Sequence, residues 1–283
     1  MRALSLSLIS LTTLVVACGP VQSDEGVITP ASTPASTSAT AVPFPAGEAF
    51  DYQLGGAYEP PAEVRVVVRD STAQPSRGRY NICYVNGFQS QPGDRELWLR
   101  ERGDLVLREP GGDPMVDPDW PDEFILDTST DGKRQRLAEY AGQAIARCAA
   151  SGFAAVEIDN LDSATRSNGK LTMEDNLELA AALARTAHAA GLAIGQKNAA
   201  ELGDRGRREA GFDFAVSEEC LVFDECGAYR EAYGERIVDI EYTDRLPGSA
   251  DEVCARPDRP RATIIRDRKL VAIGEDGHYY RRC

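Results

Sequence analysis

The stretch Ala154-Ala155-Val156-Glu157-Ile158-Asp159-Asn160-Leu161-Asp162 begins as an apolar run and ends in acidic and amide side chains. This pattern is typical of a parallel strand with a buried body and a carboxyl end that faces a polar cleft. Apolar residues spaced three and four apart predict a helix before it, between residues 137 and 148. A second helix is expected after it, with Thr172 as N-cap and Asp175 three residues later. Helix, strand, helix is the repeat unit of an α/β barrel or a doubly wound sheet.

Seven further segments have an apolar body and a polar end. They are residues 50–56, 64–68, 80–86, 123–127, 192–198, 212–220 and 236–242. A last piece, 262–267, is expected to close or cover the sheet. Eight such strands predict an α/β fold, a (β/α)8 TIM barrel with its active site at the carboxyl ends of the strands. A doubly wound sheet is the alternative, but no glycine-rich phosphate turn follows the first strand.

The N-terminal part of the chain indicates export. Residues 1–17 contain Arg2 and an apolar run ending at Val15-Val16-Ala17-Cys18, too short and too rich in serine to span a membrane. They predict a cleaved bacterial lipoprotein signal and lipidation at Cys18; an ordinary secretory signal is the alternative. Residues 18–46, rich in Ser, Thr, Ala and Pro, predict a disordered stalk, and residues 47–283 a single catalytic barrel domain. The protein is therefore expected to be lipid-anchored to the cell envelope, or secreted.

The folded part contains six cysteines, an even number that indicates disulfides in an exported chain. Their spacing favours three pairs: Cys220 with Cys226, Cys254 with Cys283, and Cys83 with Cys148. Zinc is disfavoured, because there is no CxxC pair and the chain has only His188 and His278. No metal and no other cofactor is expected.

The net charge and the absence of several known motifs exclude some classes of function. The formal net charge is −14, with 45 acidic and 31 basic residues, which argues against a nucleic-acid partner. There is no GxSxG elbow, HExxH or Walker loop. Paired carboxylates at predicted strand ends are what glycoside hydrolysis needs, although any one of them could instead be a helix cap or a surface charge. The candidates are Asp70, Asp127, Asp159, Asp162, Glu218, Glu219 and Glu241.

An ordered set of motifs resembles glycoside hydrolase family 114, the endo-α-1,4-polygalactosaminidases. The motifs are Phe50-Asp51-Tyr52-Gln53-Leu54-Gly55-Gly56, Asn81-Ile82-Cys83-Tyr84-Val85-Asn86-Gly87, Val156-Glu157-Ile158-Asp159-Asn160-Leu161-Asp162, Gln196-Lys197-Asn198, and Val216-Ser217-Glu218-Glu219-Cys220 with Asp224-Glu225-Cys226. The resemblance spans about residues 48 to 283. It implies a (β/α)8 barrel and endo-hydrolysis of α-1,4-linked galactosamine polymers. Ser217 departs from the pattern, in which Asn is expected.

The resemblance implies that Asp159 and Glu218 are the catalytic pair, at the fifth and seventh predicted strands, with Glu219 as the alternative. Adjacent strand residues face opposite ways, so only one of the two glutamates can point into the barrel mouth. Carboxylates are expected to bind sugar ammonium groups and tyrosines to pack the ring. The predicted substrate-binding residues are Asp51, Tyr52, Asp70, Tyr84, Asp127, Asn160, Asp162, Lys197, Asn198, Glu241 and Tyr242. The expected partner is galactosamine-containing polysaccharide, and the chain is expected to be a monomer that touches membrane through its lipid alone.

Two other functions remain open at this point. Lys197 ends a predicted strand, where a Schiff-base lyase would have its lysine, but that chemistry needs a lowered lysine pKa and a ring of carboxylates does the opposite. The chain could also be a surface lipoprotein that binds polysaccharide without cleaving it. Turnover of a galactosamine polymer separates the second alternative from the hydrolase.

Overall fold

The computed structural model describes residues 41–283. In that part of the chain the sheet has nine strands. They are β1 (Phe50–Gln53), β2 (Val66–Asp70), β3 (Tyr80–Asn86), β4 (Ala155–Asp159), β5 (Ala193–Lys197), β6 (Phe214–Glu218), β7 (Ile237–Tyr242), β8 (Ala262–Arg266) and β9 (Tyr280–Arg282). The signal, Cys18 and the stalk up to residue 40 lie outside the described residues.

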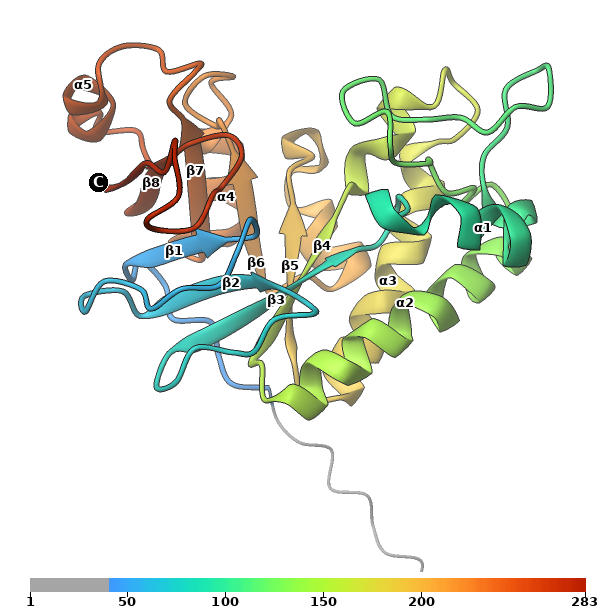
Figure 1. The fold of residues 1–283 in the computed structure, drawn as a ribbon, viewed down its shortest axis with the longest axis horizontal. Coiled ribbons are helices and arrows are strands. Elements are labelled where there is room, and N and C mark those ends of the chain that lie inside the picture. The colour runs from blue at the N-terminus through green and yellow to red at the C-terminus, as the bar shows by residue number, and fades with distance from the viewer. Residues whose placement is uncertain (1–40) are drawn as a thin grey trace, which may run out of the picture. The chain divides into compact units, whose positions relative to one another are not determined.

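The strands pair in the order in which they occur in the chain. β1 to β8 are parallel to their neighbours, and β9 is antiparallel to β8. Between β8 and β1, Arg266 forms a 3.2 Å ion pair with Asp51, and the Tyr280 hydroxyl donates to the Phe50 carbonyl at 2.9 Å. Parallel strands in chain order, with helices in the connections after β3 and the first and last parallel strands brought together, form a (β/α)8-type barrel, so the expected fold class is confirmed (Figure 1).

Five α-helices lie in the described part of the chain, and Figure 1 shows α2 and α3 side by side, packed against β3 to β5. None of them is long and apolar enough to cross a membrane. The helices are α1 (Arg95–Glu101), α2 (Asp131–Ser151), α3 (Met173–Ala189), α4 (Cys226–Tyr233) and α5 (Ala250–Ala255), with short 3-10 and π turns η1 (Pro92–Asp94), η2 (Gly103–Leu105), η3 (Leu161–Arg166), η4 (Ala200–Leu202) and η5 (Gly206–Ala210).

Local capping sets the ends of the two long helices. The Thr130 side chain accepts a hydrogen bond from the Lys133 amide at the start of α2, and Gly152 ends that helix with φ +90°. Thr172 and Asp175 form a complete capping box at the start of α3, as their spacing predicted. These caps fix where each crossover leaves and re-enters the sheet.

One predicted strand is wrong. Residues 123–127 do not join the barrel; they make isolated bridges to Gln89, Val106 and Val116 within the long connection between β3 and α2. Their apolar side chains are buried there, with Ile125 in a small cluster beside Leu107. The run is buried by local packing of this connection, which an apolar sequence signal alone does not distinguish from burial in a sheet.

The eighth barrel position belongs to β8, the piece that was expected to close or cover the sheet. Asp159 and Glu218 therefore end the fourth and sixth strands instead of the fifth and seventh. The two residues are still two strands apart, so their side chains can still face one another across the mouth of the barrel.

Two apolar clusters hold the fold together. One lies inside the barrel and includes Phe50, Val66 and Phe214. Gly195 allows this packing, because a Cβ there would lie 2.5 Å from the Phe214 ring. The larger cluster lies between the outer face of the strands and the helices. Alternation along each strand thus sorts side chains into an interior and a helix-facing layer.

Three disulfides are present, and their pairing is the one that the spacing favoured. Cys83 on β3 is bonded to Cys148 on α2, across 65 residues of sequence. Cys220 is bonded to Cys226 in the turn after β6, and Cys254 to Cys283 near the last strand. Such bonds persist in oxidising compartments, which is consistent with an exported protein.

Candidate active site

A cleft of about 530 Å³ opens at the carboxyl ends of the barrel strands. Five strands each place their last residue in its wall, namely Asp70, Asp159, Lys197, Glu218 and Tyr242. Barrel enzymes carry their active sites at this face, because the strand ends converge there while the loops vary. The cleft is therefore the candidate active site.

Alternation along β4 directs Asp159 into the mouth of the barrel. Val156 and Ile158 pack outward in the layer shared with the helices, so Glu157 and Asp159 face the interior. Asp159 lines the cleft and accepts a 2.6 Å hydrogen bond from the Tyr84 hydroxyl. Glu157 lies one step deeper, where it is fully buried.

The ammonium group of Lys197 joins the two predicted catalytic carboxylates. Its Nζ lies 3.3 Å from Asp159 Oδ1 and 3.3 Å from Glu218 Oε2. It also lies 3.2 Å from Glu157 Oε1 and 3.2 Å from the Tyr52 hydroxyl. Burial alone would lower the pKa of Lys197, but Asp159 and Glu218 outweigh it and raise that pKa well above its usual value. Lys197 is thus a buried cation at neutral pH.

Glu218 is held by three neighbouring groups. The Tyr242 hydroxyl donates to its Oε1, and Asn198 Nδ2 donates to its Oε2 at 3.2 Å. The Glu218 amide in turn donates to Asn198 Oδ1 at 2.9 Å. Glu219 follows the last residue of β6, adopts φ +60° and forms a 2.7 Å ion pair with Arg268 instead. The register therefore places Glu218, and not Glu219, beside Lys197.

The stacked carboxyls Asp159 and Glu157 differ in charge state. Burial opposes ionisation of Asp159, but the Lys197 ammonium and the hydrogen bond from Tyr84 hold its pKa below the usual value. Burial dominates at Glu157 and raises its pKa to about 7, although Lys197 opposes the shift. Glu157 Oε2 has no hydrogen-bond partner. One ionised carboxylate thus sits at the rim above a carboxyl that is half protonated near neutral pH.

Sequence reasoning missed one wall of the cleft, which the connection between β3 and α2 and the turn η3 provide. It includes Asp117, Trp120 and Glu123, together with Arg166 from η3. Arg166 forms ion pairs with Asp117 at 2.6 Å and with Asp162 at 2.9 Å. The Trp120 side chain is 57% exposed, as a sugar platform would be. The signal available was a long polar loop after a barrel strand, where such enzymes place binding residues.

Three predicted binding residues lie away from the cleft. Asp51 faces Arg266 at the seam between β8 and β1, 3.2 Å away. Asp127 accepts hydrogen bonds from Ser129 and Lys133 at the start of α2, because the segment that carries it is not a barrel strand. Glu241 lies on the outward face of β7, since its neighbours in the strand pack inside the barrel. The structure thus corrects these three assignments.

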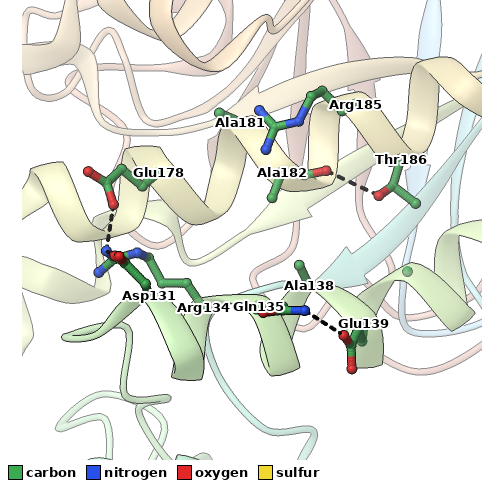
Figure 2. A pocket seen from close by; sticks show the side chains of 11 residues that line it. Asp131, Arg134, Gln135, Ala138, Glu139, Glu178, Ala181, Ala182, Arg185 and Thr186 are labelled. Carbon is green, nitrogen blue, oxygen red and sulfur yellow. Dashed lines mark hydrogen bonds and ion pairs between the residues drawn. The ribbon is translucent and has the colours of Figure 1, made fainter.

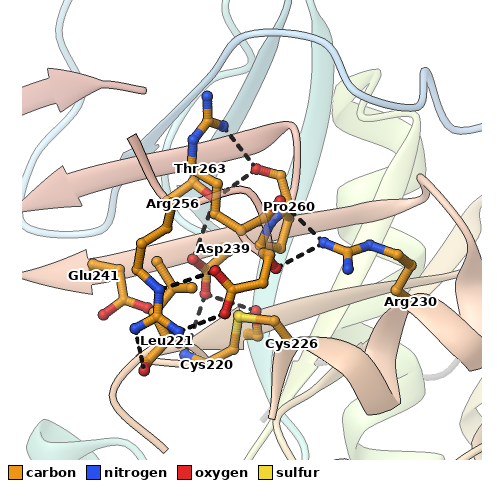
Figure 3. Close-up of a disulfide and its surroundings, with 12 residues drawn as sticks. Cys220, Leu221, Cys226, Arg230, Asp239, Glu241, Arg256, Pro260 and Thr263 are labelled. Carbon is orange, nitrogen blue, oxygen red and sulfur yellow. Dashed lines mark hydrogen bonds and ion pairs between the residues drawn. A yellow bond between two sulfur atoms is a disulfide. The ribbon is translucent and has the colours of Figure 1, made fainter. Parts of the chain in front are cut away.

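Glu241 shares the outer face of β7 with Asp239, behind the disulfide between Cys220 and Cys226 (Figure 3). Glu241 Oε1 accepts a 2.8 Å hydrogen bond from the Leu221 amide, and Asp239 Oδ1 one of 2.9 Å from the Ser217 hydroxyl. Burial raises the pKa of Asp239 to about 7, and burial together with the Asp239 charge raises that of Glu241 to about 8. This pair secures the turn that follows Glu218, and it does not face the cleft.

The remaining predicted binding residues all line the cleft, and their roles in binding stay predictions. Tyr52 and Tyr242 are buried in its floor and Tyr84 is partly buried, and the hydroxyl of each donates a hydrogen bond to a carboxyl group. The full set in the cleft is Tyr52, Asp70, Tyr84, Asn160, Asp162, Lys197, Asn198 and Tyr242.

A larger hollow of about 850 Å³ lies on the outside of the barrel, between α2 and α3 (Figure 2). Its walls are helix side chains such as Arg134, Glu139 and Arg185. Arg134 forms ion pairs across it, including one with Glu178 at 2.6 Å. No strand end reaches it, so its size does not make it the reaction site.

The barrel and the carboxylates at its strand ends define a class, the (β/α)8-barrel glycosidases, whose chemistry needs two acids flanking one bond. A glycoside hydrolase family GH114 model matches residues 30–283. The chain belongs to this family. A search of curated proteins found no match.

Solved structures support the fold. The complex of Aspergillus fumigatus Ega3 with galactosamine has a TM-score of 0.68 at 21% identity, covering 87% of this chain and 100% of that one. The glycoside hydrolase domain of PelA from Pseudomonas aeruginosa has a TM-score of 0.53 at 16% identity, covering 80% of this chain and 96% of that one. A variant of the same domain has a TM-score of 0.56 at 15% identity and the same coverage.

Proposed function

We propose that this chain is an endo-acting glycoside hydrolase that cleaves α-1,4-linked galactosamine polysaccharide with Asp159 and Glu218. Family membership supports the reaction class, and the galactosamine bound to the similar Ega3 supports the sugar. The observation that carries the proposal is the position of Lys197 Nζ, 3.3 Å from an oxygen of each carboxylate in a cleft at the strand ends.

The two carboxylates have different roles in this proposal. Asp159, kept ionised by Lys197, is the nucleophile that attacks the anomeric carbon. Glu218 donates a proton to the leaving glycosidic oxygen and later takes one from the water that hydrolyses the glycosyl ester on Asp159. Tyr242 and Asn198 orient Glu218 for both steps.

The spacing of the pair favours retention of configuration. Both oxygens lie at hydrogen-bond distance from one ammonium nitrogen. Two oxygens that each lie 3.3 Å from one nitrogen are at most about 6.6 Å apart, which fits the ~5–5.5 Å of retaining enzymes and only the lower end of the ~6.5–9.5 Å of inverting ones.

Lys197 balances charge through both steps. Before attack it faces an ionised Asp159 and a protonated Glu218. After attack Asp159 is an uncharged ester and Glu218 is ionised, so one carboxylate of the catalytic pair faces the ammonium at each stage, beside Glu157. A protonated amine cannot attack a carbonyl, so the raised pKa of Lys197 argues against the Schiff-base alternative.

Digestion of a de-N-acetylated α-1,4-galactosamine polymer by the purified protein tests the proposal. We expect oligosaccharides of intermediate length, and proton NMR at early times should show the α-anomer released first. Release of monosaccharide alone would refute endo action, and early β-anomer would refute retention. Binding without any cleavage would establish the non-catalytic alternative.

We also propose that Cys18 carries lipid that anchors the protein through a stalk of residues 18–46 to the cell envelope, with residues 47–283 acting as a monomeric catalytic domain. The lipobox-like run at Val15-Val16-Ala17-Cys18 supports the anchor. Mass spectrometry of the mature protein should find a diacylglyceryl-modified Cys18. An unmodified N-terminus at another residue would contradict the anchor.

A further inference from the structure

Glu123 is a carboxyl group built into the wall of the cleft and unused by the mechanism above. Its Oε2 accepts a 3.0 Å hydrogen bond from Asn86 Nδ2. The Asn86 oxygen accepts from the Gln89 amide at 3.0 Å and from Asn160 Nδ2 at 3.1 Å, which fixes the direction of the Asn86 amide. Within residues 41–283, no hydrogen bond or ion pair reaches Glu123 Oε1. One oxygen is clamped and the other is free for a ligand.

The hydrogen bonds that hold Glu123 through Asn86 continue to Asp159, the proposed nucleophile. Asn160, which holds Asn86, follows Asp159 in the chain, and its backbone amide donates to Asp159 Oδ1 at 2.8 Å. Glu123 and Asp159 thus belong to one rigid network on one side of the cleft. A sugar attacked at C1 by Asp159 carries its nitrogen on the neighbouring carbon, C2. The nitrogen substituent therefore lies close to the carboxylate that attacks.

Within residues 41–283, Glu123 has carboxylates nearby but no cation that forms an ion pair with it. Burial is the main cause that raises its pKa to about 7, and the nearby Asp159 and Asp117 charges add to it, against the hydrogen bond from Asn86. Arg166 is the cation that opposes the shift, but its guanidinium already forms ion pairs with Asp117 and Asp162. A ligand that brings a positive charge would be favoured here.

We propose that Glu123 determines specificity by contacting the nitrogen substituent of the sugar. When Glu123 is ionised, it forms an ion pair with the ammonium of galactosamine. When it is protonated, it donates a hydrogen bond to the carbonyl oxygen of an acetamido group. This inference rests on the proposed function and deepens it. Under this proposal, one side chain in the β3–α2 connection, outside the catalytic pair, distinguishes deacetylated from acetylated sugar units.

The sign of the pH dependence follows from linkage. Ammonium binding favours the ionised carboxyl, so deacetylated substrate gains as the pH rises towards and through about 7, up to the pH at which the sugar ammonium loses its own proton, while acetylated substrate loses its proton donor over the same range. The ratio of kcat/KM for the deacetylated over the acetylated substrate should therefore increase with pH. Glu123→Gln, which cannot ionise but can still donate, should remove this change.

The experiment compares wild type, E123Q and the control D122N, which removes the same charge from the exposed neighbouring residue. Substrates are α-1,4-galactosamine oligosaccharides, either fully deacetylated or fully N-acetylated. E123Q should raise KM for the deacetylated substrate about 10- to 100-fold, with a smaller change in kcat, and leave KM for the acetylated one within about threefold. D122N should behave as wild type.

Equal losses on both substrates, or a selectivity ratio that still rises with pH in E123Q, would overturn the inference. If wild type cleaved neither oligosaccharide, the proposed function would fail by itself. Calorimetric titration of the same two ligands into wild type and E123Q would then decide the role of Glu123. Selective loss of affinity for the deacetylated ligand would support that role, and unchanged affinity for both would refute it.

Discussion

At the scale of single residues, the site is organised around Lys197, a buried cation with three carboxyl groups within 3.3 Å. Removing one partner of such a network leaves the others uncompensated, so losses here exceed those at exposed ion pairs. Two of these carboxyl groups differ in charge state. Asp159 is ionised and Glu157 titrates near neutral pH.

Asp159→Asn and Glu218→Gln should each reduce kcat by at least about 10²-fold, because one removes the nucleophile and the other the acid. Glu219→Gln is the matched control, since that side chain does not line the cleft and pairs with Arg268 instead of Lys197. Initial rates on the galactosamine polymer, with circular dichroism to verify folding, measure the effect. An inactive E219Q beside an active E218Q would transfer the role to Glu219.

Lys197→Met should move the acidic limb of the kcat/KM profile to higher pH. Without the ammonium, only the hydrogen bonds from Tyr84 and the Asn160 amide oppose the effect of burial on the pKa of Asp159, so a higher pH is needed to ionise the nucleophile. The exposed Lys170→Met serves as control. A variant that is dead at every pH while folded would instead indicate that Lys197 takes a covalent role.

At the scale of elements, the turn after β6 connects Glu218, the proposed catalytic acid, to the outer layer. Glu218 ends β6, Glu219 turns the chain, and Cys220 is bonded to Cys226 at the start of α4. The buried carboxyls of Asp239 and Glu241 accept hydrogen bonds from the backbone amides of this turn. Their charge state therefore affects an element that positions the active site.

The Asp239 and Glu241 pair should make stability fall as the pH rises. Both folded-state pKa values lie above those of an unfolded chain, so the folded state binds more protons. The free energy of unfolding therefore decreases between about pH 4 and about pH 8, by up to roughly 1.4 kcal/mol per pH unit for each carboxyl. Glu241→Gln keeps the acceptor for the Leu221 amide and cannot ionise. Urea unfolding at several pH values should show a weaker decline in E241Q.

Exposed carboxyls provide the comparison for that experiment. Glu235→Gln, in the exposed turn before β7, removes the same charge without changing a buried group. Its pH profile of unfolding free energy should match wild type. If E241Q and wild type also matched, the buried pair would not control the pH response.

At the scale of the whole molecule, the disulfide between Cys83 and Cys148 ties β3 to α2 across the long connection that forms the cleft wall. In the chain-entropy view a loop of this length is worth about 4 kcal/mol, whereas the six-residue loop between Cys220 and Cys226 is worth about 2 kcal/mol. The C83A/C148A variant should therefore lose more stability than C220A/C226A. Guanidinium unfolding measures both, and the opposite ranking would refute the account.

Much of the candidate site could be predicted from the sequence, because strand-end polarity and disulfide spacing are local signals. Asp159, Lys197 and Glu218 each end an apolar run, and parallel strands bring such ends to one face. Alternation allowed only one of Glu218 and Glu219 to face the cleft, without deciding which, and it also shows why Glu241 and Tyr242 cannot both face the cleft. That rule, applied to Asp51 and Tyr52 as well, would have removed two of the three wrong assignments.

Only the tertiary structure decided the rest. The run at residues 123–127 is apolar enough for a strand, and whether it entered the barrel or packed on its own loop depended on contacts distant in sequence, such as those to Gln89 and Val106. The same packing brought Glu123 and Arg166 into the cleft wall. Burial in a strand and burial in a folded loop have the same apolar signature, so the sequence determined the floor of the candidate site, and long-range packing determined the wall that contains Glu123 and Arg166.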